Sequence, residues 1–333
     1  MFNSASLSFN PVVLSLLNPL DVVKVIEDNV RRYGFPFPVP REAVYSWAKP
    51  LRLLDRGSTM LYTGALYQLT PYIASIVEQL SAIEGSRVSG LALKLSGILS
   101  SLGVSRLIVR PKGDMVSVVE RILTSIVSLL ERAEVKVAYP YEDDMYSGVL
   151  LYDLGLDELF KEHAVKVYRA LKSRGAELLV TVDPHTTHIM RSVYPRYVDG
   201  YDLEVKSYLE VLAERGVRLV REPSGGKVVI HDPCLYARFE NVVEQPRMLL
   251  RTAGFDVLEP RRSRKMTYCC GGPIEGLTPK MAKMIAKTRL EELREKSGTI
   301  VTLCPICYAN LRAVAEGDVE VIDIALVLSG AKP

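Results

Sequence analysis

The sequence predicts an α/β protein with two pseudo-symmetric Rossmann-like domains built on parallel sheets, preceded by an N-terminal helical extension. Strand-like and helix-like segments alternate, which implies parallel pairing and right-handed crossovers. Landmarks recur in the same order in two halves of the chain, and 333 residues with 48% apolar content can bury two cores of ordinary size. The predicted parts are an extension over residues 1–57, a degenerate α/β domain without cysteines over 58–190, a connector over 191–225 and a cysteine-containing α/β domain over 226–333.

The individual elements follow from apolar periodicity and turn residues. In the second half we expect strands over 227–232, 255–260 and 299–304, and helices over 240–254, interrupted at Pro246, over 279–298 and from Pro305, with 319–330 closing the domain. In the first half we expect helices over 117–133 and 155–175, strands over 135–140 and 176–183, and a helix over 202–216 in the connector.

Two pairs of segments indicate an internal repeat. LLERAEVKVAYP, residues 129–140, matches LLRTAGFDVLEP, residues 249–260. VTVDPHTTHIM, residues 180–190, matches VTLCPICYANL, residues 301–311, with Asp183 and Thr186 where the second segment has Cys304 and Cys307. The repeat therefore has a cysteine motif in one copy only.

Further landmarks keep the same order. DDMYSG ends at Gly148, and TYCCGG places Gly271 directly after a cysteine pair. Upstream, TGALYQL around Ala65 matches DPCLYAR around Cys234, whereas an alternative register pairs RLIVRPKGD, which ends at Asp114, with KVVIHDPC. Both registers stay open at this point, and neither gives the first half a thiol.

Composition narrows the class of protein. A net charge of +3 without a Lys/Arg block argues against nucleic acid as a partner. The N-terminus has no basic region, and its apolar run from Val12 to Leu20 is broken by Asn18 and Pro19, so we expect neither a signal peptide nor a membrane span, and a cytoplasmic protein. Three Gln and six Asn beside many Arg, Glu and Lys are a balance often seen in thermophiles.

The cysteines are confined to one region. All five, Cys234, Cys269, Cys270, Cys304 and Cys307, lie in the last hundred residues. An odd number that includes an adjacent pair and a C-x-x-C motif is a poor disulfide framework but a plausible metal cage.

The predicted fold brings these cysteines together, because loops at the carboxyl ends of parallel strands share one edge of the sheet. Three separate stretches then deliver five sulfur atoms to one rim. Cys307 is expected in the first turn of a helix, where free amides favour a thiolate. Gly271 and Gly272 are expected to let the backbone approach a bulky inorganic group.

The spacing leaves the metal open. A structural zinc and a cubane 4Fe-4S cluster each take four ligands, so a fifth thiolate indicates a cluster of other geometry or a cysteine left free for chemistry. An iron-sulfur cluster is favoured over zinc, and redox disulfides or unliganded thiols are the third interpretation.

The motifs HDPCLY, TYCCGGP and TLCPICYANL resemble the cysteine-rich CCG domain of heterodisulfide reductase catalytic subunits and their relatives, over about residues 58–328. Those relatives include DsrK-like subunits and the iron-sulfur subunits of glycolate, lactate and anaerobic glycerol-3-phosphate dehydrogenases. The resemblance implies a noncubane 4Fe-4S cluster held by all five cysteines.

Two departures from this family matter. Family members commonly contain two CCG repeats, whereas here the first repeat is a degenerate copy without ligands. Longer relatives also carry a ferredoxin-like segment with C-x-x-C-x-x-C runs, which this sequence lacks. The resemblance therefore implies a ferredoxin-type iron-sulfur or flavoprotein subunit as electron donor, with a quinone-linked membrane subunit as a further candidate partner that would hold the chain at the cytoplasmic face.

Polar residues near the motifs admit two interpretations each. Asp183, His185 and His188 either face substrate or cluster, or Asp183 simply caps a helix. His231 either donates to the cluster, the substrate or a departing thiolate, or bonds a backbone carbonyl. His163 is predicted on a helix surface.

The basic run RRSRK, residues 261–265, is either a solvated loop or a docking site for an acidic electron donor. On the whole sequence we predict an oxidoreductase subunit of heterodisulfide reductase type, active only with partner subunits, that passes electrons to a disulfide, a sulfur species or a quinone. The alternatives are an electron-transfer subunit of a hydroxy-acid dehydrogenase and a non-catalytic scaffold subunit stapled by zinc.

Overall fold

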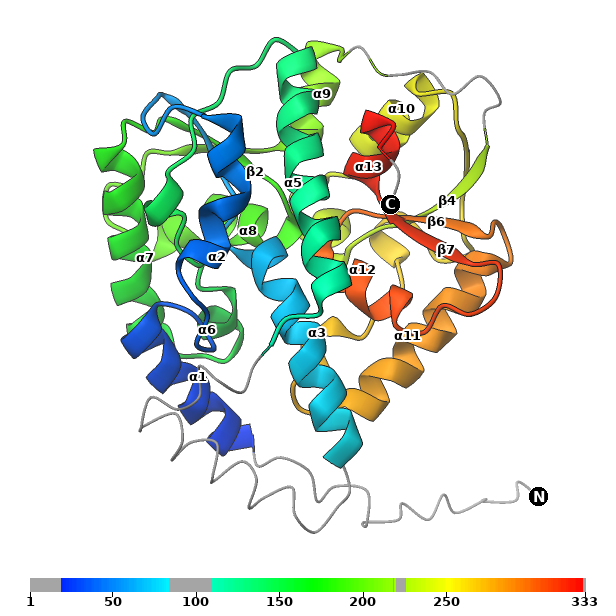
Figure 1. Cartoon of the computed structure of the whole chain (residues 1–333), viewed down its shortest axis with the longest axis horizontal. Coiled ribbons are helices and arrows are strands. Elements are labelled where there is room, and N and C mark those ends of the chain that lie inside the picture. The colour runs from blue at the N-terminus through cyan, green and yellow to red at the C-terminus, as the bar shows by residue number, and fades with distance from the viewer. Residues whose placement is uncertain (1–18, 84–109, 218, 220–225, 332–333) are drawn as a thin grey trace, which may run out of the picture.

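The computed structural model describes residues 19–83, 110–217, 219 and 226–331, and shows a mixed α/β protein with two parallel sheets (Figure 1). The first sheet has the order β1-β2-β3, with β1 Thr59–Tyr62, β2 Leu178–Thr181 and β3 Glu204–Ser207. The second has the order β5-β4-β6-β7, with β4 Lys227–His231, β5 Asp256–Leu258, β6 Thr299–Thr302 and β7 Glu320–Asp323. The predicted α/β class with parallel strands is confirmed.

Helices surround both sheets. They are α1 Pro19–Tyr33, α2 Glu42–Tyr45, α3 Leu66–Ile83, α5 Gly113–Arg132, α6 Val149–Asp153, α7 Asp157–Ser173, α8 Pro184–His188, α9 Tyr208–Arg215, α10 Glu244–Thr252, α11 Pro279–Arg294, α12 Pro305–Arg312 and α13 Ile324–Ser329. Short turns of other helix types include η2 Ser46–Leu51, η7 Tyr236–Glu240, η8 Arg264–Met266 and η9 Gly272–Ile274. Residues 12–18 of the apolar N-terminal run lie outside the described residues. Within the described part of the chain, no helix has the length and apolar character needed to cross a membrane.

Three predicted elements differ from the structure. The helix expected over 202–216 begins as strand β3, because a capping box formed by Ser207 and Glu210 starts α9 only at Tyr208. The segment expected to connect the halves thus supplies the edge strand of the first sheet. The strand expected over 135–140 is reduced to one bridge between Ala138 and Met60. Pro246 lies in the first turn of α10 and does not interrupt it, because amides there need no helical partner.

The two sheets share one register. In the first, Met60 lies between Ala138 and Leu179, and Leu179 in turn lies opposite Val205. In the second, the equivalent row is Leu258, Val229, Ile300 and Val321. These pairs reproduce the offsets of the sequence repeat and align Ala65 with Cys234. The alternative register pairs RLIVRPKGD with KVVIHDPC, the segment that contains β4. The last residue of RLIVRPKGD, Asp114, belongs to α5, and residues 106–109 lie outside the described residues.

The halves pack on each other through helices. α5 contacts α13, α9 and α3, and α3 contacts α11 and α12. Figure 1 shows α5 and α3 in the middle of the molecule, with the second sheet to one side of them. One continuous apolar core includes Ile122 and Leu130 of α5 together with Val229 and Leu326 from the second half. The carboxyl edges of both sheets are therefore held in a fixed relation.

Candidate metal centre

A buried ion pair ties the first two cysteine-bearing loops together. Asp232, two residues before Cys234, receives two hydrogen bonds of 2.8 Å from the guanidinium of Arg247, and both side chains are buried. The same carboxylate accepts from the backbone amide of Arg264 at 2.7 Å, and Thr267 donates to the backbone carbonyl of Asp232 at 2.8 Å. Because Thr267 lies two residues before Cys269, these bonds fix the loop after β5 against the loop after β4.

The third loop follows β6. Cys304 is the N-cap residue of α12 and is fully buried, and Pro305 occupies the first helical position. Cys307 lies in the first turn of α12, as predicted. The sulfur atoms of Cys270 and Cys307 and a ring nitrogen of His231 all lie within 4.8 Å of one another. All five cysteines are free thiols.

Mutual contacts divide the thiols into two kinds. The neighbouring Cys269 and Cys307 thiols, helped by His231, lower the pKa of Cys270 well below its usual range. Burial opposes charge on Cys304, but Cys307 and His185 outweigh it and lower the pKa of Cys304 to about 6. Burial, with the charges of Cys304 and Cys270, raises the pKa of Cys234 to about 11. The arrangement therefore favours thiolates at Cys270 and Cys304 and a neutral thiol at Cys234.

His231 has a defined tautomer. Nε of Arg289 donates to Nδ1 of His231 at 3.1 Å, and an arginine N–H can only donate, so Nδ1 must be the unprotonated nitrogen. Burial lowers the pKa of His231, which keeps the ring neutral and leaves its hydrogen on Nε2. Nε2 is buried and has no hydrogen-bond partner within the part of the chain that the structure describes. His231 thus offers a free N–H close to the sulfur atoms.

The two glycines of the CCGG motif have packing roles. Gly271 has φ +91°, and a Cβ there would lie 2.5 Å from the backbone oxygen of Ala282 in α11. A Cβ on Gly272 would lie 2.5 Å from Cγ2 of Ile306 and 3.6 Å from the sulfur of Cys270. Gly271 therefore allows a left-handed turn against α11, and Gly272 keeps Cys270 close to α12. The approach to an inorganic group that the sequence suggested for both glycines stays a prediction.

Asp183, His185 and His188 of the DPHTTH segment each have different contacts. Oδ1 of Asp183 accepts from the amides of His185 and Thr186 at 2.8 and 3.0 Å, so Asp183 is the N-cap of α8. Nδ1 of His185 lies 3.7 Å from the sulfur of Cys304, across the interface between the halves. Burial disfavours charge on His185, but Cys304 and Asp183 raise its pKa to about 9. Only His185 reaches the cysteines.

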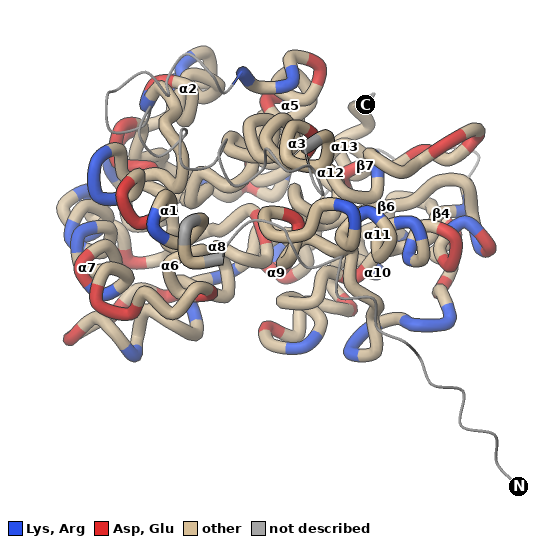
Figure 2. The backbone as a smooth tube through the Cα atoms, turned by 90° about the horizontal axis from the view of Figure 1, so that it is seen from below, with Lys and Arg blue, Asp and Glu red and all other residues tan. Residues whose placement is uncertain are grey.

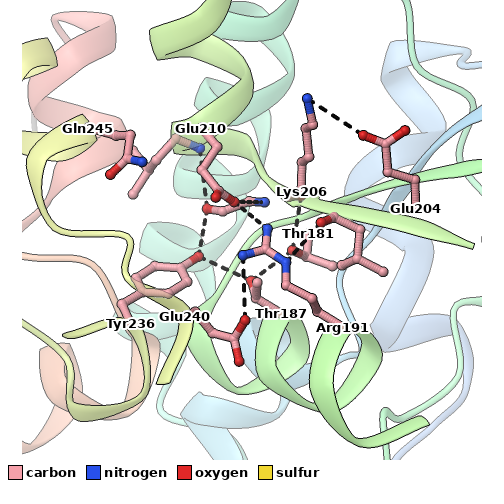
Figure 3. A network of polar contacts seen from close by, with 12 residues as sticks. Thr181, Thr187, Arg191, Glu204, Lys206, Glu210, Tyr236, Glu240 and Gln245 are labelled. Carbon is pink, nitrogen blue, oxygen red and sulfur yellow. Dashed lines mark hydrogen bonds and ion pairs between the residues drawn. The ribbon is translucent and has the colours of Figure 1, made fainter. Parts of the chain in front are cut away.

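His188 belongs to a second interface network. Its Nδ1 lies 2.6 Å from Oε1 of Glu240 in η7, and Ser192 donates to the same carboxylate at 2.8 Å. Figure 3 shows the neighbouring contacts, in which Arg191 lies between Glu240 and Glu210. His188 therefore fixes the relation between the halves beside the cysteines.

Four of the five matching positions of the first half are filled by small or polar side chains, and the fifth, opposite Cys269, by the buried Tyr146. Ala65, Ser147, Asp183 and Thr186 are fully buried where the second half has cysteines. A Cβ on Gly64 would lie 2.6 Å from Oγ1 of Thr186 and 3.0 Å from Cβ of Ser147. The backbone of the first half thus packs directly onto the side chains that replace the ligands.

Sequence reasoning missed three residues near the centre. Arg289 is fully buried although it lies on the apolar face of α11 with Ala282, Ala286 and Leu293, and a charge within such a stripe is the signal that would have identified it. Asp232 and Glu275 were also missed. Glu275 accepts from Asn310 of α12 at 2.6 Å, and burial raises its pKa to about 8.

The prediction for His163 is wrong. Its ring is buried under α6, with Nε2 2.6 Å from the backbone oxygen of Tyr146, and burial lowers its pKa. The side chain that the helix pattern placed on the surface instead closes the core of the first half.

The donor set fits a sulfur-ligated metal group. Several soft thiol donors converge with the unpartnered Nε2 of His231, and soft thiolates select iron-sulfur clusters, zinc or copper(I) over magnesium or calcium. A buried site with an unpartnered N–H donor near sulfur is also an environment that adjusts the reduction potential of a bound metal group.

Comparison with known proteins agrees with this site. Residues 228–312 match the family model of the cysteine-rich domain CCG, so the second half of this chain carries a CCG domain, as the motifs predicted. The match runs from the second residue of β4 to the end of α12 and includes all five cysteines.

The similar proteins are redox proteins. The chain is 29% identical over 206 residues to a probable membrane-anchored ferredoxin of Chromohalobacter salexigens, with 59% of this chain and 30% of that protein aligned. It is 29% identical over 227 residues to the EtfAB:quinone oxidoreductase of Syntrophomonas wolfei (63% and 32%) and 30% identical over 171 residues to a subunit of the fumarate reductase (CoM/CoB) of Methanothermobacter marburgensis (49% and 34%). The chain spans about a third of the length of these relatives.

Proposed function

We propose that this protein is an iron-sulfur subunit of an oxidoreductase complex of heterodisulfide reductase type. The observation that carries the proposal is the convergence of free, buried or half-buried cysteines from three loops on one edge of the second sheet. Cys234, Cys269, Cys270, Cys304 and Cys307 would hold a 4Fe-4S cluster, and a fifth thiolate favours the noncubane form. Such a cluster, when bound, supplies one-electron transfer at a potential that its protein surroundings set.

The chain itself orients and tunes the site. Arg289 keeps Nδ1 of His231 unprotonated, so the hydrogen on Nε2 is free to be donated to a sulfur atom of the cluster. Hydrogen bonds to sulfur raise the reduction potential of such centres. Gly271 donates its amide to the sulfur of Cys269 at 3.3 Å, which acts in the same direction. Cys270, Cys304 and Cys307 are buried, whereas Cys234 and Cys269 are half-buried and mark the side from which a substrate would approach.

The two halves are, in this proposal, pseudo-symmetric Rossmann-like domains, the first a degenerate CCG repeat kept as scaffold, which extends past the predicted limit at residue 190 to include β3 and α9. The shared sheet register and the equivalent left-handed glycines, Gly148 with φ +87° and Gly271 with φ +91°, support this. The first half would contribute His185 to the cluster rim and no ligand.

The names of the relatives support a proposal for the acceptor and the partners. The name EtfAB:quinone oxidoreductase supports delivery of electrons to a quinone, and the resemblance of the cysteine motifs to heterodisulfide reductase subunits supports a disulfide or another sulfur species. A ferredoxin-type or flavoprotein subunit would be the donor, and any attachment to the cytoplasmic face of a membrane would come through a partner.

Metal analysis of protein purified without oxygen tests the proposal. About four irons with matching acid-labile sulfide per chain are expected, together with a visible-region absorbance that reduction bleaches. One zinc without visible absorbance would instead establish a zinc-stapled scaffold and reject the proposal. Co-purification with a hydroxy-acid-oxidising flavoprotein would assign the cluster to that class of dehydrogenase.

Serine substitutions test the ligands. Cys304→Ser and Cys307→Ser are expected to abolish cluster assembly. The matched control is Thr186→Ser, at the position of the first half that is equivalent to Cys307, and it should keep full iron content. Full iron content after each of the five cysteine substitutions would reject the ligand assignment.

A further inference from the structure

One segment concentrates the positive charge of this near-neutral chain. Residues 260–290 contain a single acidic residue, Glu275, and eight basic ones, Arg261, Arg262, Arg264, Lys265, Lys280, Lys283, Lys287 and Arg289. Because the net charge of the whole chain is only +3, the rest of the chain is net negative. The positive charge is thus concentrated on the segment that contains Cys269 and Cys270.

Part of this charge is neutralised within the fold. Arg262 and Arg289 both pair with Glu292, and Arg264 pairs with Glu244 and Glu259. Arg261, Lys265, Lys283 and Lys287 are exposed, and none of them has an ion-pair partner among residues that the structure describes. Figure 2 shows basic positions gathered at α11. These four cations remain available to a partner.

Exposed methionines lie among these cations. Met266 is 75% exposed beside Lys265, and Met281 and Met284, three residues apart on one face of α11, are 48% and 64% exposed. Apolar anchors within a charged rim are typical of protein interfaces, and methionine adapts to different partners because it is flexible and polarizable. We define the α11 face as Met281, Lys283, Met284 and Lys287 of α11 together with Arg261, Lys265 and Met266 of the adjoining loop, which Arg262 joins to Arg289 and Glu292.

The α11 face lies close to the cysteines. Cys269 is half-buried, and Gly271, two residues further along the chain, packs against the backbone of Ala282 between Met281 and Lys283. The loop from Arg261 to Lys265 leads directly into the cysteine pair. A protein bound here would therefore sit near the half-buried thiol.

We propose that the α11 face docks a small acidic electron-carrier protein of the ferredoxin or flavodoxin class. This inference rests on the proposed function, because it adds the site at which the electron donor binds. Charge complementarity supports it: an acidic carrier would be attracted to the unpaired cations, and the methionines would supply the apolar contact that charge alone does not give. Nucleic acid is disfavoured because the cations are interrupted by exposed methionines.

The test compares two triple charge reversals of equal net charge. The first variant combines Lys265→Glu, Lys283→Glu and Lys287→Glu. The control combines Lys161→Glu, Lys166→Glu and Arg169→Glu, three exposed cations on α7 of the other half. Binding of an acidic bacterial ferredoxin is measured by calorimetry at about 20 mM salt, where surface charges are weakly screened, and at about 300 mM salt, where they are strongly screened.

The first variant is expected to bind at least about 10-fold more weakly than wild type at low salt, and the control about as well as wild type. Met281→Ser with Met284→Ser should weaken binding without changing its salt dependence. Equal binding by both charge variants would overturn the proposal. The proposal would also be overturned if the wild type bound phosphatidylserine vesicles or duplex DNA instead of ferredoxin and only the first variant lost that binding.

Iron content separates this test from that of the proposed function. All variants are expected to keep the wild-type iron content. A protein without iron that still binds ferredoxin through the α11 face would reject the cluster and leave the docking site standing. Full iron content together with unchanged ferredoxin binding by the first variant would support the cluster and reject the docking site.

Discussion

The hydroxyl of Tyr67 donates a 2.7 Å hydrogen bond to Oδ2 of Asp323, which caps the last helix of the other half. Its counterpart in the repeat, Tyr236, lies 2.7 Å from Oγ of Ser207, which caps the last helix of the first half. All four side chains are buried. Each half therefore completes a helix cap of the other, and the two contacts hold the sheet edges that face the cysteines.

Removing either hydroxyl is expected to destabilise the whole chain. Tyr67→Phe at pH 8 should cost about 1.5–3 kcal/mol of unfolding free energy, because it takes a donor from a buried carboxylate, and Tyr236→Phe should cost about 1 kcal/mol. Urea unfolding followed by circular dichroism measures both values. Tyr168→Phe is the control, because its hydroxyl bonds Asp202 at the exposed surface. An equal loss in all three variants would contradict the cross-interface role.

Gly271→Ala is expected to disrupt the cysteine loop. A Cβ there would lie 2.5 Å from the backbone oxygen of Ala282, so either α11 or the loop must move. Gly155→Ala is the matched control, since Gly155 also has a positive φ, +71°, but a Cβ would meet nothing within 4 Å. We expect loss of most bound iron in the first variant only, measured by metal analysis. Equal iron in both variants would show that the close contact is tolerated.

Asp183→Ala is expected to weaken α8 without removing iron. Loss of the N-cap bonds to His185 and Thr186 should cost about 1 kcal/mol, and Asp183→Asn should recover most of it because asparagine also caps helices. Unfolding free energy and iron content are measured together. A fall in iron content with Asp183→Asn, in which the cap survives, would point instead to a direct role of the carboxylate at the cluster.

The stability of the first half is expected to depend on pH through Asp144. Burial raises the pKa of this carboxyl to about 6, above its unfolded value of about 3.9. Its contribution is therefore fully present below about pH 4 and is lost as the pH rises to about 6, at up to about 1.4 kcal/mol per pH unit. Asp144→Asn should remove this slope in urea unfolding at several pH values. The exposed Asp318→Asn is the control and should leave the slope unchanged.

The sequence predicted the elements whose patterns are local. Strands β2, β4 and β6 are short apolar runs that end one or two residues before Asp183, Asp232 and Cys304, so the shared edge of the cysteines followed from parallel pairing. The strand pairs reproduce the repeat offsets, and they select the alignment of Ala65 with Cys234 that the sequence had left open. For these elements, sequence periodicity and tertiary packing agree.

Other features depend on contacts between distant segments. Val205 is the one fully apolar residue of β3 (Glu204–Ser207), so the pairing with β2 decides its conformation. His163 follows a surface-like pattern, yet the carbonyl of Tyr146 draws it inside. The role of Gly271 depends on α11, which comes later in the chain. A pattern within one segment carries no information about such partners.

The packing of α5 on α13 also has a consequence for synthesis. Ser125 and Arg132 of α5 bond Ser329 at 3.1 and 3.3 Å, and the apolar face of α5 is covered by residues such as Leu326 and Leu328. Translation completes α5, which ends at Arg132, about two hundred residues before α13, which begins at Ile324. During that interval the apolar face of α5 that α13 later covers is exposed, so a nascent chain halted before residue 324 is expected to bind chaperones.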